Sequence, residues 1–169
     1  QAGKTTVLRA WLSARGQPAL RIDCEQPLVR AWCRSAPLFL RDLDALVDTP
    51  CALLFDEAQF LDEAGLFIKG LVDRDYPAPL LVTGSSSYHL GARTRESLAG
   101  RATRTRLLPF SLAEVCHDLG DRPAALRARA VEERLHRHLI VGGYPDVWGA
   151  ERPGPLLTEL VEAFVLRDA

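Results

Sequence analysis

The stretch Ala52-Leu53-Leu54-Phe55-Asp56-Glu57 is an apolar run that ends abruptly in two carboxylates. A continuous apolar run of this length is typical of a strand buried on both faces of a parallel sheet, and we expect such a strand over 51–55. In α/β proteins, ligands bind at the carboxyl ends of parallel strands. We therefore expect Asp56 and Glu57 to serve a binding site. The alternative, that they cap the next helix, is weaker because Asp62 is better placed as that cap.

A second polar motif, Gly3-Lys4-Thr5-Thr6, matches the end of the phosphate-loop pattern G-x-x-x-x-G-K-[ST], whose first glycine would precede residue 1. Glycine lets the backbone curl so that N–H groups point at a phosphate, and the helix opening at Thr5 adds the positive end of its dipole. The Lys4 ammonium neutralises phosphate oxygens, and the Thr5 hydroxyl is a hard ligand suited to Mg²⁺. The alternative is a solvated lysine after an ordinary glycine turn, and the acidic strand end favours the phosphate loop.

The remaining sequence alternates strand-length apolar runs with helical patterns as far as Pro109, and its pattern is wholly helical beyond that residue. This alternation predicts an α/β core with a mainly parallel sheet over 1–109, followed by a helical segment over 110–169. We expect further strands at 19–24, 79–83 and 102–108, and helices at 5–14, 37–46, 62–73, 94–99, through 126–139 up to Gly142-Gly143, and from about 155 onward. On three helices the spacing predicts apolar stripes: Val7, Leu8, Trp11 and Leu12; Leu66, Phe67, Gly70 and Leu71; and Leu126, Ala130, Leu135 and Leu139.

The composition is that of an ordinary globular protein, with 47% apolar and 25% charged residues and a net charge of -1. The near-neutral charge gives no electrostatic reason to expect nucleic acid or a membrane surface. No apolar run approaches the roughly 18 residues of a membrane span, so we expect a cytoplasmic protein. The four cysteines show no C-x-x-C spacing, which favours buried, reduced thiols over a metal site or disulfides.

Several arginines allow a nucleic-acid interpretation, which the neighbouring acids weaken. Arg104 and Arg106 alternate along one expected strand, and further arginines crowd the long helix around Glu132 and Glu133. Because acids are interspersed, solvated faces explain these arginines better, and nucleic acid is not indicated as a partner.

With these elements in this order, the chain resembles the AAA-type ATPases over nearly its whole length. It is most similar to the prokaryotic AAA family whose members carry an additional C-terminal domain of uncharacterised function. The motifs that carry the resemblance are Gly3-Lys4-Thr5-Thr6, Asp56-Glu57-Ala58-Gln59, Thr83-Gly84-Ser85-Ser86, Leu98-Ala99-Gly100-Arg101, Leu108-Pro109-Phe110-Ser111 with Glu114, Gly142-Gly143-Tyr144-Pro145 and Arg167-Asp168. The sequence departs from the family at both ends, because the strand before the phosphate loop and the C-terminal domain are not in it.

The resemblance implies a P-loop three-layer sandwich, here without its first strand, followed by a small helical lid. It implies Mg²⁺-dependent ATP binding and hydrolysis, with Gly3, Lys4, Thr5 and Thr6 at the phosphates and with Thr5 and Asp56 at the metal. Glu57 would activate the attacking water. A polar residue at the tip of the next strand, Ser85 in preference to Thr83, would sense the γ-phosphate, although an ordinary Gly/Ser turn also explains that stretch.

Arg101 falls where AAA-type proteins often place an arginine that reaches a neighbouring subunit's γ-phosphate, which would imply a homo-oligomer. The alternative is one surface arginine among several. Two other functions stay open for the whole chain. One is a nucleotide-gated module that switches an unidentified protein partner with little turnover. The other is a P-loop kinase, against which the Asp56-Glu57 pair argues. Because the expected first strand would lie between 80–83 and 102–108, we expect residues 1–169 alone neither to fold well nor to bind ATP.

Overall fold

The computed structural model describes residues 3–16, 18–84, 98 and 100–168. Within the chain, Lys4–Thr105 and Arg106–Ala169 form two compact units, and Gly3 groups with the second. We call them the sheet unit and the helical unit and describe each by itself. The helix expected over 94–99 lies outside the described residues, apart from Leu98, which is a buried turn residue.

The sheet unit is built on three parallel strands, β1 (Ala19–Asp23), β2 (Ala52–Asp56) and β3 (Leu80–Val82), in the order β1-β2-β3. β2 lies in the middle and is buried at every position, which explains why its sequence is continuously apolar up to Asp56. The mixed α/β fold with a parallel sheet confirms the fold class predicted from the sequence, and it is consistent with a P-loop NTPase fold.

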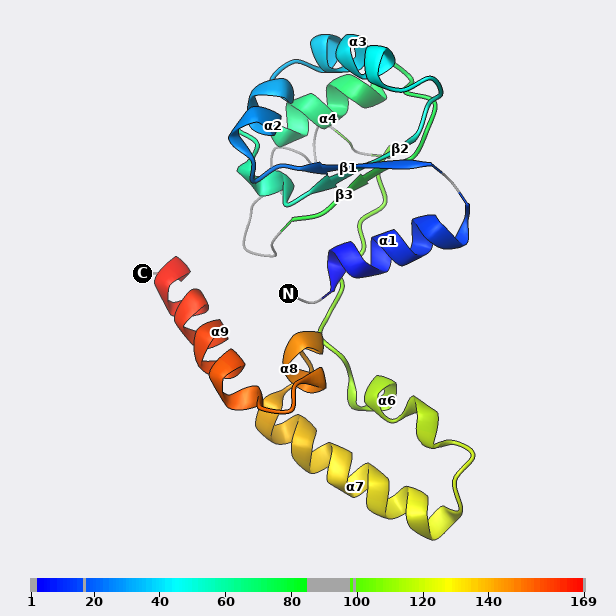
Figure 1. The fold of residues 1–169 in the computed structure, drawn as a ribbon, viewed down its shortest axis with the longest axis vertical. Helices are drawn as coiled ribbons and strands as arrows, with labels where there is room; N and C mark the ends of the chain where they lie inside the picture. Colours follow the sequence, from blue (N-terminus) through cyan, green and yellow to red (C-terminus); the bar gives the residue numbers. More distant parts are fainter. Residues whose placement is uncertain (1–2, 17, 85–97, 99, 169) are drawn as a thin grey trace. The chain divides into compact units, whose positions relative to one another are not determined.

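Helices cover both faces of this sheet, which gives the unit its three layers (Figure 1). α1 (Lys4–Ala14) lies on one face, and α2 (Pro27–Trp32), α3 (Ala36–Leu46) and α4 (Ala64–Val72) lie on the other. A 3-10 turn, η1 (Ala58–Phe60), follows β2 after one intervening residue, Glu57. The sequence analysis missed α2, a six-residue helix that begins with a proline, because one and a half turns are too short for a periodic apolar pattern.

The main core lies between the sheet and the layer of α3 and α4. Phe55 of β2, Phe39 of α3 and Phe67 of α4 meet there, with ring centroids 5.3 to 5.8 Å apart. Phe39 and Phe55 are completely buried. Pairs of this kind add about 0.5–1.5 kcal/mol each beyond the area they bury. Residues 53 and 55 therefore face this core, and the alternation of a strand places residues 54 and 56 on the face toward α1.

The expected apolar stripes of the sheet unit are partly wrong. On α4 the buried set is Ala64, Phe67, Ile68 and Leu71, which follows the i, i+3, i+4, i+7 spacing and leaves Leu66 on the flank of the helix, 60% exposed. On α1 only Leu12 is buried, while Val7 and Trp11 are 51% and 37% exposed. The cap of α4 is Glu63 rather than Asp62, one residue later than expected.

The strand expected over 102–108 is not formed. These residues have no regular structure and are all exposed. A strand needs a neighbouring strand whose backbone pairs with its own N–H and C=O groups. No strand among the described residues pairs with 102–108, so this segment lacks the partner that a strand needs.

The helical unit, as far as the structure describes it, contains two long helices and three short ones. α6 (Leu112–Val115), η2 (His117–Leu119), α7 (Ala124–Val141), α8 (Pro145–Gly149) and α9 (Pro153–Asp168) follow in order. The two long helices, α7 and α9, correspond to those expected through 126–139 and from about 155 onward. Ser111 begins α6 with a capping box, because its hydroxyl accepts from the N–H of Glu114 and the Glu114 carboxylate accepts from the N–H of Ser111. None of the helices that the structure describes has the length and apolarity to cross a membrane.

The stripe expected along α7 does not form a core. Leu126 and Leu139 are 61% and 74% exposed, and only Val141 of this helix is buried. α6, η2, α8 and α9 all contact α7, and the first three have only three to five residues each. These contacts leave Leu126 and Leu139 exposed, so the apolar face of α7 is only partly covered within the unit.

The pair Gly142-Gly143 ends α7 and joins it to the start of the unit. Gly142 has φ +74°, a conformation that a residue with a Cβ rarely adopts. Gly143 is buried against the backbone of Phe110, whose N–H donates to the Gly143 carbonyl oxygen at 2.7 Å. A Cβ on Gly143 would lie only 2.1 Å from the Phe110 carbonyl oxygen, so no side chain fits there without moving the backbone.

We predict that Gly143→Ala destabilises the helical unit by about 1–3 kcal/mol, because the added methyl overlaps backbone atoms that cannot rotate away. Amide hydrogen exchange in α6 and α7 of the full-length protein measures the change as lost protection. The matched control is Gly149→Ala, where nothing lies within 4 Å of the added Cβ. Equal protection in the two variants would contradict the prediction.

Candidate functional site

Three elements of the sheet unit bring polar side chains together at the carboxyl edge of the sheet. Lys4 and Thr5 open α1, Asp56 is the last residue of β2, and Thr83 follows the end of β3. Because Phe55 points into the core under α3 and α4, the next residue, Asp56, points toward α1. The sequence analysis expected Thr5 and Asp56 at one metal site, and it preferred Ser85 to Thr83 at the tip of the next strand.

Asp56 is the centre of this group and is buried, with 2% of its surface exposed. Its Oδ1 accepts a hydrogen bond from the Thr5 hydroxyl at 2.8 Å and another from the Thr83 hydroxyl at 2.7 Å. The carboxylate therefore ties the start of α1 to the ends of both β2 and β3. A threonine at the start of a helix and an aspartate at the end of a strand supply two hard oxygen atoms side by side, which is the donor chemistry that Mg²⁺ prefers.

The other oxygen of Asp56 is held by Arg21, a residue that the sequence analysis did not single out. Arg21 donates to Oδ2 from Nε at 2.9 Å and from Nη2 at 2.7 Å. In the parallel register Arg21 lies opposite Leu54 and Asp23 lies opposite Asp56, so Arg21 reaches Asp56 diagonally on the same face. The signal was the alternation in Ala19-Leu20-Arg21-Ile22-Asp23, which places two charges on one strand face.

The surroundings of Asp56 favour its ionised form. Burial acts to raise the pKa of Asp56, but the hydrogen bonds from Thr83, Thr5 and Arg21, together with the charge of Arg21, outweigh it and hold the pKa below its ordinary value. The hydrogen bond to Asp56 in turn raises the pKa of Arg21. Both partners are therefore fully charged at neutral pH.

The residues of the expected phosphate loop lie as follows. Gly3 has φ +80°, a conformation that suits glycine. The Lys4 ammonium donates to the carbonyl oxygen of Gly84 at 2.6 Å, so it reaches across to the end of β3. Thr5 makes the contact with Asp56 described above, and Thr6 is exposed on α1. Lys4 and Thr5 thus both point toward the strand ends, and Thr6 makes no contact there that the structure records.

Glu57 has an unusual backbone, with φ 54° and ψ 48° in the left-handed region. A non-glycine residue seldom takes this conformation, and the residues that do are often found at functional sites. Its N–H donates to the Thr83 hydroxyl at 3.0 Å, and its carboxylate accepts from the Gln59 side chain. Glu57 is only half-buried, so its carboxylate is accessible from solvent while its backbone is fixed.

Thr83 joins these two acids, since its hydroxyl accepts from the Glu57 N–H and donates to Asp56. Its backbone also bridges the strand ends, because its N–H donates to Phe55 and its carbonyl accepts from Ala58. Thr83 is 4% exposed. Ser85, which the sequence analysis had preferred as the γ-phosphate sensor, lies outside the described residues.

Arg101, the expected trans-acting arginine, does not contact this group of residues in the structure. Its guanidinium pairs with Asp73, just after α4, and its side chain is 56% exposed. These two residues line a shallow hollow of about 450 Å³ with Val72 and Asp75. An arginine in that position is accessible to a second molecule.

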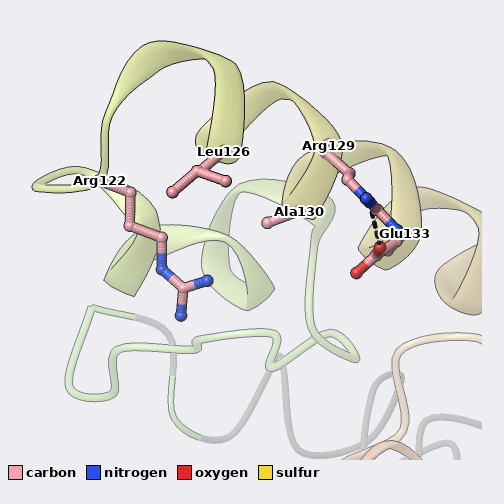
Figure 2. Close-up of a pocket in the computed structure, with 5 residues that line it drawn as sticks. All are labelled: Arg122, Leu126, Arg129, Ala130 and Glu133. Atoms are coloured by element: carbon pink, nitrogen blue, oxygen red, sulfur yellow. Dashed lines mark hydrogen bonds and ion pairs between the residues drawn. The ribbon is translucent and has the colours of Figure 1, made fainter.

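The arginines of the long helix α7 interact within the helical unit. Arg134 pairs with Asp118, Arg137 donates to the carbonyl oxygens of Trp148 and Ala150, and Arg129 pairs with Glu133. Figure 2 shows this last pair beside a hollow of about 510 Å³ that is also lined by Arg122, Leu126 and Ala130. These contacts explain the arginine-rich stretch without a ligand.

Other metal or thiol chemistry has little support among the residues that the structure describes. No three side chains of histidine, cysteine, aspartate and glutamate gather there as a metal site would need. The four cysteines are free; Cys24, Cys33 and Cys51 are buried, and Cys116 is half-buried. Burial raises the pKa of Cys24 and of Cys33 to about 12, so both stay protonated and unreactive.

We predict that Thr83→Val lowers the free energy of unfolding by about 1–3 kcal/mol at pH 7, because it leaves the Glu57 N–H without a partner and takes a donor from Asp56. The part due to Asp56 depends on pH. Because the pKa of Asp56 is lower in the folded protein, its ionised form stabilises the fold at pH values above its pKa in the unfolded chain, near 3.9. This stabilisation is lost as the pH falls through the pKa of Asp56 in the folded protein. Urea unfolding should therefore show a smaller difference at pH 3 than at pH 7.

Thr83→Ser is the control, since it keeps the hydroxyl and should stay within about 1 kcal/mol of the parent at both pH values. The bridging role would be wrong if Thr83→Val unfolded with the parental free energy at pH 7.

Comparison with known proteins identifies the family. The AAA domain family matches residues 1–116. The Uncharacterized protein Rv2008c of Mycobacterium tuberculosis and the Uncharacterized protein Mb2031c of Mycobacterium bovis are each 32% identical over 141 residues, which are 79% of this chain and 30% of those proteins. The Uncharacterized protein MJ1544 of Methanocaldococcus jannaschii is 28% identical over 99 residues, which are 56% of the chain and 22% of that protein. No solved structure matches the chain.

The chain thus spans about 30% of the length of the mycobacterial relatives. The family match covers the sheet unit with its parallel strands, the Gly3-Lys4-Thr5-Thr6 motif and the Asp56-Glu57 pair. The chain therefore belongs to the AAA domain family, whose members are P-loop proteins that bind ATP.

Proposed function

We propose that this chain carries the catalytic site of a Mg²⁺-dependent ATPase. The observation that supports this most directly is the 2.8 Å hydrogen bond from the Thr5 hydroxyl to the Asp56 carboxylate. It joins the start of the helix after the phosphate-loop motif to the acidic end of the central strand. These are the two positions between which P-loop enzymes bind a metal-bound nucleotide.

Lys4 and the first turn of α1 would bind the phosphates. The N–H groups of a first helical turn have no intrahelical partners and carry a partial positive charge, which attracts phosphate. Lys4 is at the same helix end, and its present partner is a neutral carbonyl oxygen of Gly84. A phosphate oxygen is a stronger partner for an ammonium group than a carbonyl oxygen is, so nucleotide binding would draw Lys4 away from Gly84.

The residues fit a divalent cation of the magnesium type. The Thr5 hydroxyl oxygen can ligate a metal through its lone pairs and still donate its proton to Asp56 Oδ1. Bound Mg²⁺ would neutralise charge on the β- and γ-phosphate oxygens. Asp56 would hold the hydroxyl in place and accept from a metal-bound water, which needs the ionised carboxylate that its environment favours.

Glu57 is the residue that we assign to water activation. In hydrolysis, a water oxygen attacks the γ-phosphorus in line, the bond to the β–γ bridging oxygen breaks, and the water proton passes to the Glu57 carboxylate. The left-handed backbone and the Gln59 contact fix the direction of this carboxylate. Thr83 links Glu57 to Asp56 through one hydroxyl, so it would position the general base relative to the metal site. Ser85 remains our proposal for a γ-phosphate contact.

We predict that Glu57→Gln keeps ATP binding while hydrolysis falls about 100-fold or more, as expected for the loss of a general base. Lys4→Ala should instead weaken ATP binding by roughly tenfold or more, because a charged partner of the phosphates is removed. Both are measured on the full-length protein, as phosphate release at saturating ATP and as nucleotide affinity by calorimetry.

The matched control is Glu63→Gln, which changes an exposed glutamate six residues further along the chain. It should hydrolyse ATP at the parental rate. A Glu57→Gln protein with parental turnover would remove Glu57 from the mechanism. Parental ATP binding with little turnover in every protein tested would favour a nucleotide-gated interaction module. Transfer of phosphate to a small acceptor would favour a kinase.

We further propose that Arg101 acts on the γ-phosphate of a neighbouring subunit. Its exposure supports this role, and its pairing with Asp73 provides the competing explanation that it is only a surface ion pair. The assembly and any protein partner of the full-length protein are part of this proposal, because the chain spans about 30% of its mycobacterial relatives.

We predict that Arg101→Ala lowers turnover about tenfold or more without changing nucleotide affinity. Mixed with Lys4→Ala, it should regain activity, because each protein supplies what the other lacks. Asp73→Asn removes the same ion pair but leaves the guanidinium in place, so it should keep full turnover. If a mixture with verified assembly regains no activity, Arg101 belongs to the surface ion pair. The same holds if Asp73→Asn loses as much turnover as Arg101→Ala.

A further inference from the structure

The Asp56 carboxylate has no acceptor capacity left in this structure. An ionised carboxylate offers about four lone-pair sites, two on each oxygen. Hydroxyl groups of Thr5 and Thr83 use both sites on Oδ1, and Nε and Nη2 of Arg21 use both on Oδ2. A metal ion, or a water bound to one, can therefore reach Asp56 only if one of these donors leaves.

The donor that can leave is Arg21. Thr5 keeps its bond to Asp56 even when its oxygen ligates a metal, because the hydroxyl proton is still free to donate. Thr83 is buried and is also fixed by the Glu57 N–H. Arg21, by contrast, contacts Asp56 through its guanidinium group, and its side chain is 41% exposed. It also has a second acid nearby, since its Nη2 lies 3.9 Å from Asp23 Oδ2.

We propose that Arg21 is a resident counter-ion of Asp56 that competes with Mg²⁺, so that metal–nucleotide binding exchanges one cation for another. Without metal, Arg21 neutralises the buried carboxylate. When Mg²⁺ binds at Thr5, the guanidinium leaves Oδ2 and pairs with Asp23. Arg21 is thus a positioning residue that sets how much Mg²⁺ the site requires. This inference rests on the proposed function.

The exchange follows from charge. Two cations cannot both stay within a few ångströms of one buried carboxylate without strong repulsion, since the interior screens charge weakly. Leaving the carboxylate with no cation is also costly. The carboxylate therefore favours one positive partner at a time. Asp23 is half-buried and accepts from the N–H of Glu25 and from the Gln26 amide, so its position is fixed to receive the guanidinium.

The test uses the full-length protein with ADP at a series of free Mg²⁺ concentrations. The measured quantity is the Mg²⁺ concentration that half-maximally promotes ADP binding. An arginine beside a carboxylate shifts its affinity for a proton by about 1–3 pKa units, and we expect a comparable effect on a metal ion. Arg21→Gln should therefore lower the half-maximal Mg²⁺ concentration about tenfold or more. Arg21→Lys keeps the charge but has one compact donor group. Its half-maximal Mg²⁺ concentration should lie between those of the parent protein and Arg21→Gln.

Arg41→Gln is the matched control, because it also removes one arginine charge but breaks only an exposed pair with the adjacent Asp42. It should leave the Mg²⁺ requirement unchanged. Asp23→Asn should raise the Mg²⁺ requirement of the parent protein, since it removes the carboxylate with which the Arg21 guanidinium pairs after it leaves Asp56. In the Arg21→Gln background the same change should have a much smaller effect, whereas a direct effect of Asp23 on the metal would persist there.

A second readout needs no nucleotide. With Mg²⁺ removed by a chelator, Arg21→Gln should melt at a lower temperature than the parent protein, because Asp56 loses its counter-ion. Added Mg²⁺ alone should raise the melting temperature of this variant more than that of the parent. Electron paramagnetic resonance of added Mn²⁺ should likewise show tighter binding to the variant.

The outcomes separate this inference from the proposed function. A parent protein that binds no nucleotide at any Mg²⁺ concentration would overturn the proposed function and this inference with it. A parent that binds ADP with Mg²⁺, beside an Arg21→Gln variant with an unchanged Mg²⁺ requirement, would overturn only the inference. Weaker ADP binding by Arg21→Gln with and without Mg²⁺ would assign Arg21 to the phosphates and would also overturn it. If Arg21→Gln does not fold, Arg21→Lys decides in the same assays.

Discussion

The sheet unit depends on the burial of one charged group, the carboxylate of Asp56. A carboxylate with 2% of its surface exposed is stable only if it is paired and hydrogen-bonded on every side. Four donors from three different elements meet that requirement, from α1, β1 and the residue after β3. Because all four donors must reach the Asp56 carboxylate together, this buried charge constrains the positions of α1, β1 and the end of β3 relative to β2.

That arrangement has a consequence for ligand binding. The donors that stabilise Asp56 without a ligand occupy the positions that a metal ion would use. A buried carboxylate needs a positive partner when no metal is bound, and Arg21 provides one from the neighbouring strand. In the exchange that we propose, stability without ligand and affinity for the metal are opposed through this one arginine.

Thr83 adds a second connection, between the buried acid and the accessible one. Its hydroxyl accepts from the Glu57 N–H and donates to the Asp56 carboxylate. The two carboxylates have different surroundings although they belong to adjacent residues. Asp56 is saturated with donors inside the protein. Glu57, turned by its left-handed backbone, is half-buried beside Gln59. The environment of Asp56 favours its ionised form, whereas the Glu57 carboxylate is accessible from solvent.

The sequence by itself determined the α/β class and the buried strand that ends in Asp56, because continuous apolar runs and their alternation with helical patterns depend on local sequence. Only the tertiary structure decided the partners of Asp56, since Arg21 is joined to it by strand register across 35 residues. Burial on helices was also decided there. Leu66 and Leu139 fit apolar patterns but are exposed, because a pattern does not say how much neighbouring surface is available to cover it. Residues 102–108 alternate like a strand but form none, because a strand exists only with a partner.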